Sequence, residues 1–177
     1  MALEQVLPTI LDRIDGRSHG LVLGLPDGAT VEVLSRPSPD DAGFWVLRGV
    51  LPPGGSVPLH SHDEPEDFYL LSGSHQVLTQ QAGELHWADL NAGDYVSIPP
   101  GTMHAHRNVS SEPAVDLIIT TAKLGRFFEE VGRPVSDMLG PPSPEDVERL
   151  VATSIAYGYI LGTPEQNAAV GIGLQQL

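Results

Sequence analysis

The sequence predicts an all-β fold, an antiparallel barrel or sandwich, followed by C-terminal helices. From about residue 20 to residue 122, short apolar runs alternate with Gly, Pro, Asn and Asp turns, a pattern typical of short antiparallel strands. After Thr121 the apolar spacing becomes helical. We therefore expect a β-barrel over residues 1–122, including N-terminal strands, and a helical extension over residues 123–177 that packs on the barrel.

The predicted strands are short and evenly spaced. They are "GLVLGL", "ATVEVLS", "FWVLRGVL", "DFYLLSG", "HQVLTQ", "DYVSIPP" and "AVDLIIT". In the extension, "KLGRFFEEVGRP" predicts a short helix that Gly132 and Pro134 end, and "SPEDVERLVATSIAYG" a longer one with Ser143 as N-cap and Pro144 as its first residue. The tail from Thr163 has another capped start but too few apolar residues to specify its own packing. Fraying and docking on a neighbour both stay open for it.

Charge and composition exclude several classes of function. Nine Lys and Arg against 23 Asp and Glu give a net charge of −14, which repels nucleic acid and anionic membrane surfaces. The chain has no cysteine, so any metal must be held by nitrogen and oxygen. Acidic residues near the start and the lack of a long apolar run favour a soluble, cytoplasmic protein.

The stretch "PLHSHDEPEDFYLLSG" carries the first candidate ligands. Residues i and i+2 of a strand share a face, so His60 and His62 point the same way. We expect a reversal at residues 63–65, after which Glu66 begins the antiparallel partner strand and faces the same ion. An H-x-H pair alone is more often solvated surface, so a polar loop is the alternative.

A second stretch, "IPPGTMHAHRNV", supplies a further histidine. Strand alternation puts His104, His106 and Asn108 on one face and Met103, Ala105 and Arg107 on the other. The remaining acids of the first stretch, and the histidines without a ligand-type neighbour at i+2, are expected at the surface. These residues are Asp63, Glu64, Asp67, His19, His75 and His86.

These residues fit two longer patterns. G-x5-H-x-H-x3-E-x6-G is matched by Gly54, His60, His62, Glu66 and Gly73, and G-x5-P-x-G-x2-H-x3-N by Gly93, Pro99, Gly101, His104 and Asn108. Both are motifs of the cupin family, which the chain therefore resembles. The resemblance implies a jelly-roll (double-stranded β-helix) barrel with a metal held inside by His60, His62, Glu66 and His104. Such a ligand set suits iron, manganese, nickel, cobalt or zinc, and the ligand types do not specify which.

A further resemblance, to small single-domain quercetinase-like cupins, rests on "EDFYLLSG", "GDYVSIPPGTMHAHRN" and "GRFFEEVGRP". It implies a dioxygenase in which the metal binds the 3-hydroxyl of a flavonol, Glu66 is both ligand and general base, and dioxygen opens the ring with release of carbon monoxide. Two alternatives stay open: a redox-neutral cyclase, isomerase or decarboxylase of polyketide-like metabolites, and a non-catalytic small-molecule-binding cupin.

The substrate pocket is expected to include His106, Phe68 and Leu70. His106 stands where the cupin pattern usually has an apolar or aromatic residue. It is interpreted as a hydrogen-bond donor, a proton shuttle, a fifth ligand or a structural histidine. Cupins of this size commonly dimerise, so we expect a homodimer with an aromatic or enolic small molecule as its substrate.

Overall fold

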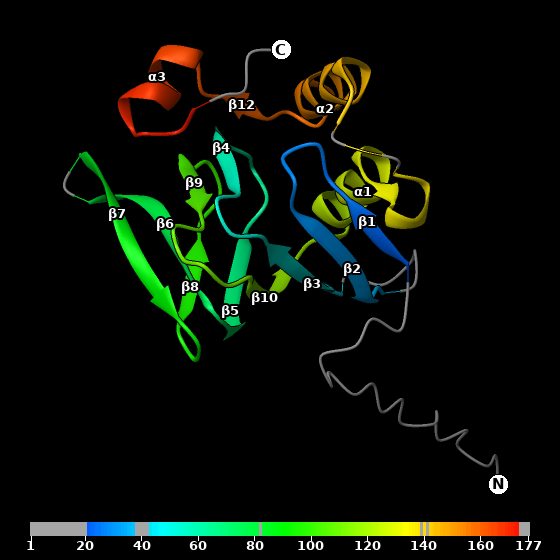
Figure 1. Cartoon of the computed structure of the whole chain (residues 1–177), viewed down its shortest axis with the longest axis horizontal. Helices are drawn as coiled ribbons and strands as arrows, with labels where there is room; N and C mark the ends of the chain where they lie inside the picture. Colours follow the sequence, from blue (N-terminus) through cyan, green and yellow to red (C-terminus); the bar gives the residue numbers. More distant parts are fainter. Residues whose placement is uncertain (1–20, 38–42, 82, 139, 141, 174–177) are drawn as a thin grey trace, which may run out of the picture.

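Two antiparallel sheets form the barrel of the computed structural model, which describes residues 21–37, 43–81, 83–138, 140 and 142–173 (Figure 1). In spatial order, the larger sheet contains β11 (Arg133–Pro134), β1 (Val22–Gly24), β2 (Thr30–Ser35), β3 (Trp45–Leu51), β10 (Ala114–Thr120), β5 (Glu66–Ser72) and β8 (Tyr95–Ile98). The smaller contains β12 (Ile160–Leu161), β4 (Ser56–Ser61), β9 (His104–Arg107), β6 (Ser74–Gln81) and β7 (Glu84–Asn91). The predicted all-β jelly roll with C-terminal helices is confirmed.

The C-terminal part supplies helices and also completes both sheets. The helices are α1 (Ala122–Val131), α2 (Pro144–Ala156) and α3 (Pro164–Ala169), with a 3-10 turn at Val135–Asp137. As predicted, Ser143 caps α2, reciprocally with Asp146, and Pro144 opens the helix. Strand β11 pairs with β1 and strand β12 with β4. Within the described residues, no helix has the length and apolar character needed to cross a membrane.

The main core lies between the sheets and under α1. Along β3 and β10, buried and half-buried residues alternate strictly, as a barrel wall requires. Helix α1 packs on β3 where Gly125 meets the ring of Trp45, which is buried. A side chain at position 125 would occupy the space of that ring, so the glycine sets how closely the helix approaches the barrel.

A second apolar cluster covers the outer face of the smaller sheet. It consists of Leu59, Leu78, Ala105 and Ile172. The amide of Leu59 donates to Oδ1 of the buried Asn167 at 2.8 Å, and Trp87 Nε1 donates to the carbonyl of Val170 at 3.0 Å. The expectation that the tail lacks the residues to specify its packing is therefore wrong for residues 163–173. The apolar side chain of Ile172 and the side-chain amide of Asn167 are enough to dock this segment on the sheet. Residues 174–177 lie outside the described residues.

Two strand assignments differ from the prediction. Strand β7 is absent from the predicted strands. Seven of its eight residues are exposed or half-buried, so the segment has no apolar run that would indicate a strand. Strand β5 does not pair with β4: it lies in the larger sheet between β10 and β8, whereas β4 lies in the smaller sheet. The reversal at residues 63–65 thus carries the chain from one wall of the barrel to the other.

We expect Gly125→Ala to destabilise the fold by about 1–3 kcal/mol, as overpacking of a core does. Its Cβ would lie 2.2 Å from Trp45 Cδ2, although the same change at an unobstructed helix position gains about 1 kcal/mol. The free energy of unfolding in denaturant measures the effect. Gly140→Ala is the control, since a Cβ there meets nothing within 4 Å, and equal stability of the two variants would contradict the packing argument.

Candidate metal centre

Three histidine side chains converge at the mouth of the barrel, two of them on paired strands. His60 of β4 and His104 of β9 are cross-strand partners, with ring centroids 4.2 Å apart. His62 follows directly after β4, and its ring lies 5.6 Å from His60 and 5.2 Å from His104. One ring nitrogen from each histidine falls within 4.8 Å of the others. This group can hold a metal ion.

Each of these rings is oriented by a backbone carbonyl two residues away. Nδ1 of His60 donates to Pro58 O at 2.7 Å, Nδ1 of His62 to Glu64 O at 2.8 Å, and Nδ1 of His104 to Thr102 O at 2.8 Å. A carbonyl oxygen only accepts, so Nδ1 carries the proton and Nε2 carries the lone pair. Such contacts fix the tautomer and direction of metal-binding imidazoles.

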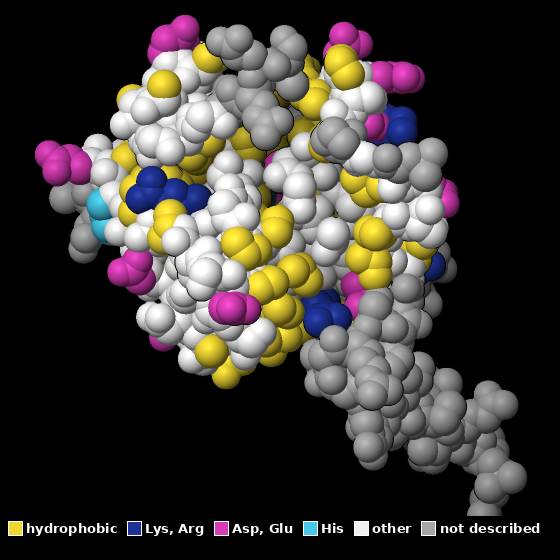
Figure 2. Space-filling model, in the orientation of Figure 1, with side chains coloured by type: hydrophobic (Ala, Val, Ile, Leu, Met, Phe, Trp, Pro, Cys, Tyr) yellow, Lys and Arg dark blue, Asp and Glu magenta, His cyan; other side chains and the backbone are white. Residues whose placement is uncertain are grey.

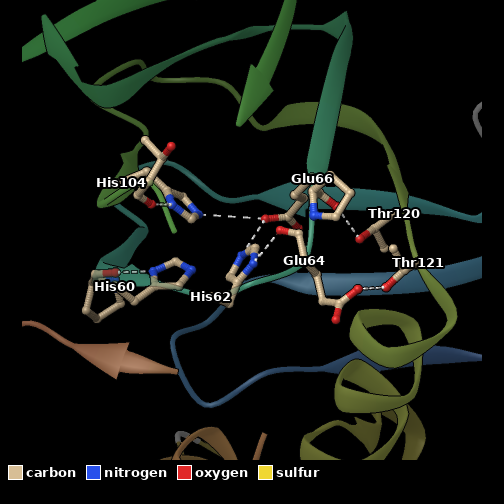
Figure 3. Close-up of polar contacts among 10 residues, drawn as sticks. His60, His62, Glu64, Glu66, His104, Thr120 and Thr121 are labelled. Carbon is tan, nitrogen blue, oxygen red and sulfur yellow. Dashed lines mark hydrogen bonds and ion pairs between the residues drawn. The ribbon is translucent and has the colours of Figure 1, made fainter. Parts of the chain in front are cut away.

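Glu66, at the start of β5, faces this cluster from the other wall of the barrel (Figure 3). Its Oε2 lies 3.5 Å from Nε2 of His62 and 3.8 Å from Nε2 of His104. The expectation that Glu66 sits alongside the histidines on a partner strand is wrong, because β5 joins the opposite sheet. The carboxylate reaches the same point across the barrel interior.

The electrostatics of the cluster suit a cation. Burial, followed by the imidazole of His104, lowers the pKa of His60 to about 3, so this ring is neutral. Burial acts to raise the pKa of Glu66, and the neighbouring imidazoles of His104 and His62 act to lower it. The buried Nε2 atoms of His62 and His104 lack a hydrogen-bond partner among the described residues. Lone pairs and a carboxylate crowded together away from water fit a divalent metal.

The second motif is tied to the first through its backbone. The turn between β8 and β9 contains Gly101 at φ +75°, a conformation that favours glycine, and its amide donates to His62 O at 2.7 Å. Asn108 is buried and donates to the carbonyls of Leu51 and Glu112 at 2.9 and 2.8 Å. These two motif residues hold loops in place, so their part in the site is indirect.

Comparisons with known proteins agree with this geometry. Residues 39–120 match the family described as "Cupin domain". These residues are therefore similar to a cupin domain. A solved cupin 2 conserved barrel domain protein from Salinispora arenicola CNS-205 superposes with a TM-score of 0.52 at 22% identity, covering 70% of this chain and 98% of that one. The polyketide cyclase RemF from Streptomyces resistomycificus gives 0.50 at 19% identity, covering 65% and 80%. These structural likenesses concern the fold.

The chain also has a curated relative. Quercetin 2,3-dioxygenase from Bacillus subtilis (strain 168) is 26% identical in an alignment of 140 residues that covers 68% of this chain. The match spans 40% of that relative's length. The matched part of this chain thus corresponds to less than half of the relative.

The other acids of the first motif lie away from the three rings. Asp63 is exposed, while Glu64 and Asp67 are half-buried. The Glu64 carboxylate accepts a hydrogen bond from Thr121 (Figure 3). It also pairs with Lys123 Nζ at 3.6 Å. Glu64 therefore joins the reversal to the beginning of α1.

His106 lies in the barrel interior behind His104, with ring centroids 5.8 Å apart. Its ring contacts Phe68 at 4.7 Å and His75 at 5.5 Å, and burial, followed by His75, lowers its pKa well below the usual value. Among the described residues, the histidine cluster does not include it. Leu70 is fully buried in the main core. The pocket roles of His106, Phe68 and Leu70 stay predictions.

The surface assignment of His75 is wrong. It is 3% exposed, and its Nε2 lies 3.2 Å from Oδ1 of the buried Asp116 on β10. The Asp116 carboxylate gives the buried imidazole a polar partner, which offsets the cost of removing it from water. Sequence spacing does not indicate this partner, because it lies far away in the chain. His86 is exposed, as predicted, and His19 lies outside the described residues. Histidine accordingly occupies only a small part of the face drawn in Figure 2.

Tyr159 is the residue at the site that the sequence did not indicate. It lies between α2 and β12, and its ring centroid is 5.6 Å from that of His60 and 4.9 Å from that of His62. Strand β12 brings it there, because Leu161 pairs with His60 across the edge of the smaller sheet. The only signal in the sequence is Gly158, which marks a helix end but not the place where the chain goes next.

We expect His104→Ala to lower the metal content of the purified protein severalfold, because it removes one of three converging ligands. Elemental analysis of protein purified without added metal measures this. His86→Ala is the matched control, since His86 is exposed and remote from the cluster in sequence. Full metal occupancy in His104→Ala would refute the assignment of this centre.

Proposed function

We propose that this protein is a metal-dependent dioxygenase that opens the ring of a flavonol or a related enolic aromatic compound. The metal ligands are His60, His62, His104 and Glu66. The observation that carries the proposal is the Glu66 carboxylate, which is buried and lies within 4 Å of two ligand nitrogens. A base is thereby available at the point where an acidic hydroxyl would bind.

Glu66 has the properties that a general base needs. It is buried, and β5 fixes it near the substrate position. It accepts the proton of the substrate's enolic hydroxyl and leaves an oxyanion. The buried surroundings strengthen the interaction of that oxyanion with nearby charges and donors.

A bound divalent transition metal supplies Lewis acidity, which lowers the pKa of a coordinated hydroxyl. The three imidazoles direct their Nε2 atoms inward, because their Nδ1 protons are committed to backbone carbonyls. Three nitrogens and one oxygen suit several first-row ions and leave positions open for substrate. The match to a quercetin 2,3-dioxygenase supports the choice of a flavonol and of dioxygen.

Oxygen consumption tests the proposal directly. Protein loaded separately with iron, manganese, nickel or cobalt should consume dioxygen with a flavonol, bleach the near-ultraviolet band of that flavonol, and release carbon monoxide. If no metal supports dioxygen uptake, the proposed dioxygenase activity is refuted. Turnover that persists without oxygen would instead indicate a redox-neutral cyclase, isomerase or decarboxylase, and saturable binding without product a binding protein.

We expect Glu66→Gln to retain most of its metal but to lose about 10²-fold or more in kcat, the typical contribution of a positioned base. Steady-state kinetics and elemental analysis on the same preparation separate the two effects. Asp67→Asn is the matched control, because the next residue of the strand points to the other face. Unchanged turnover in Glu66→Gln would remove this residue from the mechanism.

A further inference from the structure

Tyr159 is held rigidly at the centre by aromatic contacts on its two sides. Its ring stacks on Phe127 of α1, with centroids 4.6 Å apart and planes at 25°, and on His60, at 5.6 Å and 12°. The ring of His62 lies 4.9 Å away. These contacts join the ring of Tyr159 to α1 and to two of the three histidines.

The backbone around Tyr159 is fixed as well. Helix α2 ends in a Schellman turn, in which Gly158 has φ +85°, its amide donates to Ile155 O at 3.0 Å, and the amide of Tyr159 donates to Ser154 O at 2.9 Å. Beyond it, the amide of Gly162 donates to Leu59 O at 2.7 Å. The tyrosine is therefore anchored on both sides within a few residues.

The packing of the Tyr159 ring gives its hydroxyl no hydrogen-bond partner among the described residues, whereas the hydroxyl of Tyr157 donates to Glu130 at 2.8 Å. A phenol hydroxyl is protonated near neutral pH and can donate a hydrogen bond. Tyr159 is half-buried and lies beside a metal-binding cluster, so its hydroxyl is available to donate to a ligand bound there.

We propose that Tyr159 is an oxyanion-binding residue, whose hydroxyl donates a hydrogen bond to the oxygen of the substrate that Glu66 has deprotonated. This inference rests on the proposed function. It assigns the C-terminal extension a direct part in the site: Tyr159 contributes the donor and Glu66 the base, each from a different side of the histidine cluster. It also defines the substrate class as one that presents an acidic oxygen at the metal.

Such a donor acts where negative charge develops. A phenol whose ring is already packed against the centre needs little reorganisation to donate there, and removal of one preorganised donor of this kind is typically costly to the rate. The ring faces of Tyr159 are occupied by Phe127 and His60. In this proposal the hydroxyl therefore makes the contact with substrate, and the two stacked rings hold the tyrosine in place.

The test is Tyr159→Phe, which keeps the stacked ring and removes only the hydroxyl. The probe is maltol, a small pyranone with an enolic hydroxyl beside a carbonyl, titrated into cobalt-loaded protein and followed by visible absorbance. We expect Tyr159→Phe to keep the wild-type metal content and to bind maltol about tenfold more weakly, as the loss of a hydrogen bond to a charged oxygen implies. Tyr157→Phe is the matched control and should bind maltol like the wild type, because its hydroxyl faces Glu130.

Each outcome decides something. Equal maltol affinity in Tyr159→Phe and the wild type overturns the role of Tyr159, while oxygen uptake with a flavonol would leave the proposed function standing. Loss of metal in Tyr159→Phe also overturns it, since the tyrosine would then support the metal ligands. If wild-type protein does not bind maltol, the role of Tyr159 in binding an enolic oxygen is overturned, and oxygen uptake with a flavonol decides the proposed function separately.

Discussion

The arrangement that the rest of the site depends on is the set of three imidazoles whose Nδ1 protons are given to backbone carbonyls. Each acceptor lies two residues from its histidine, so local chain geometry alone fixes every tautomer. The consequence is that the Nε2 lone pairs turn inward, toward a buried carboxylate. Without a cation such a meeting of electron-rich atoms would be costly. The barrel provides the rigidity that keeps them there.

Much of this centre follows from the sequence, because its determinants are local. The i, i+2 spacing of His60 and His62 and the reversal before Glu66 can be read directly from the residues, and the cupin motifs add His104. What the sequence did not specify is which strand pairs with which. The reversal at residues 63–65 crosses between sheets, and a crossing looks the same as a hairpin when only turn-forming residues and apolar alternation are considered.

The features that sequence reasoning missed depend on contacts between distant residues. His75 is buried because Asp116, 41 positions later, lies beside it. The tail docks because Asn167 satisfies the amide of Leu59, 108 positions earlier. Strand β7 is largely exposed and lacks an apolar run. In each case the local sequence is polar and does not indicate burial or pairing, and the residues that it contacts lie in another part of the chain.

Strand β12 joins the C-terminal segment to the ligand strand at His60 itself. A ligand that binds the histidines of the folded protein more tightly than it binds the unfolded chain stabilises the folded state. By thermodynamic linkage it therefore also stabilises the docking of residues 157–173 on the barrel. The converse holds with equal strength, since coupling free energies are reciprocal. The last turn of α2 and the edge of the smaller sheet thus belong to the same cooperative unit as the metal centre, and their amide hydrogen exchange should slow together when the centre is filled.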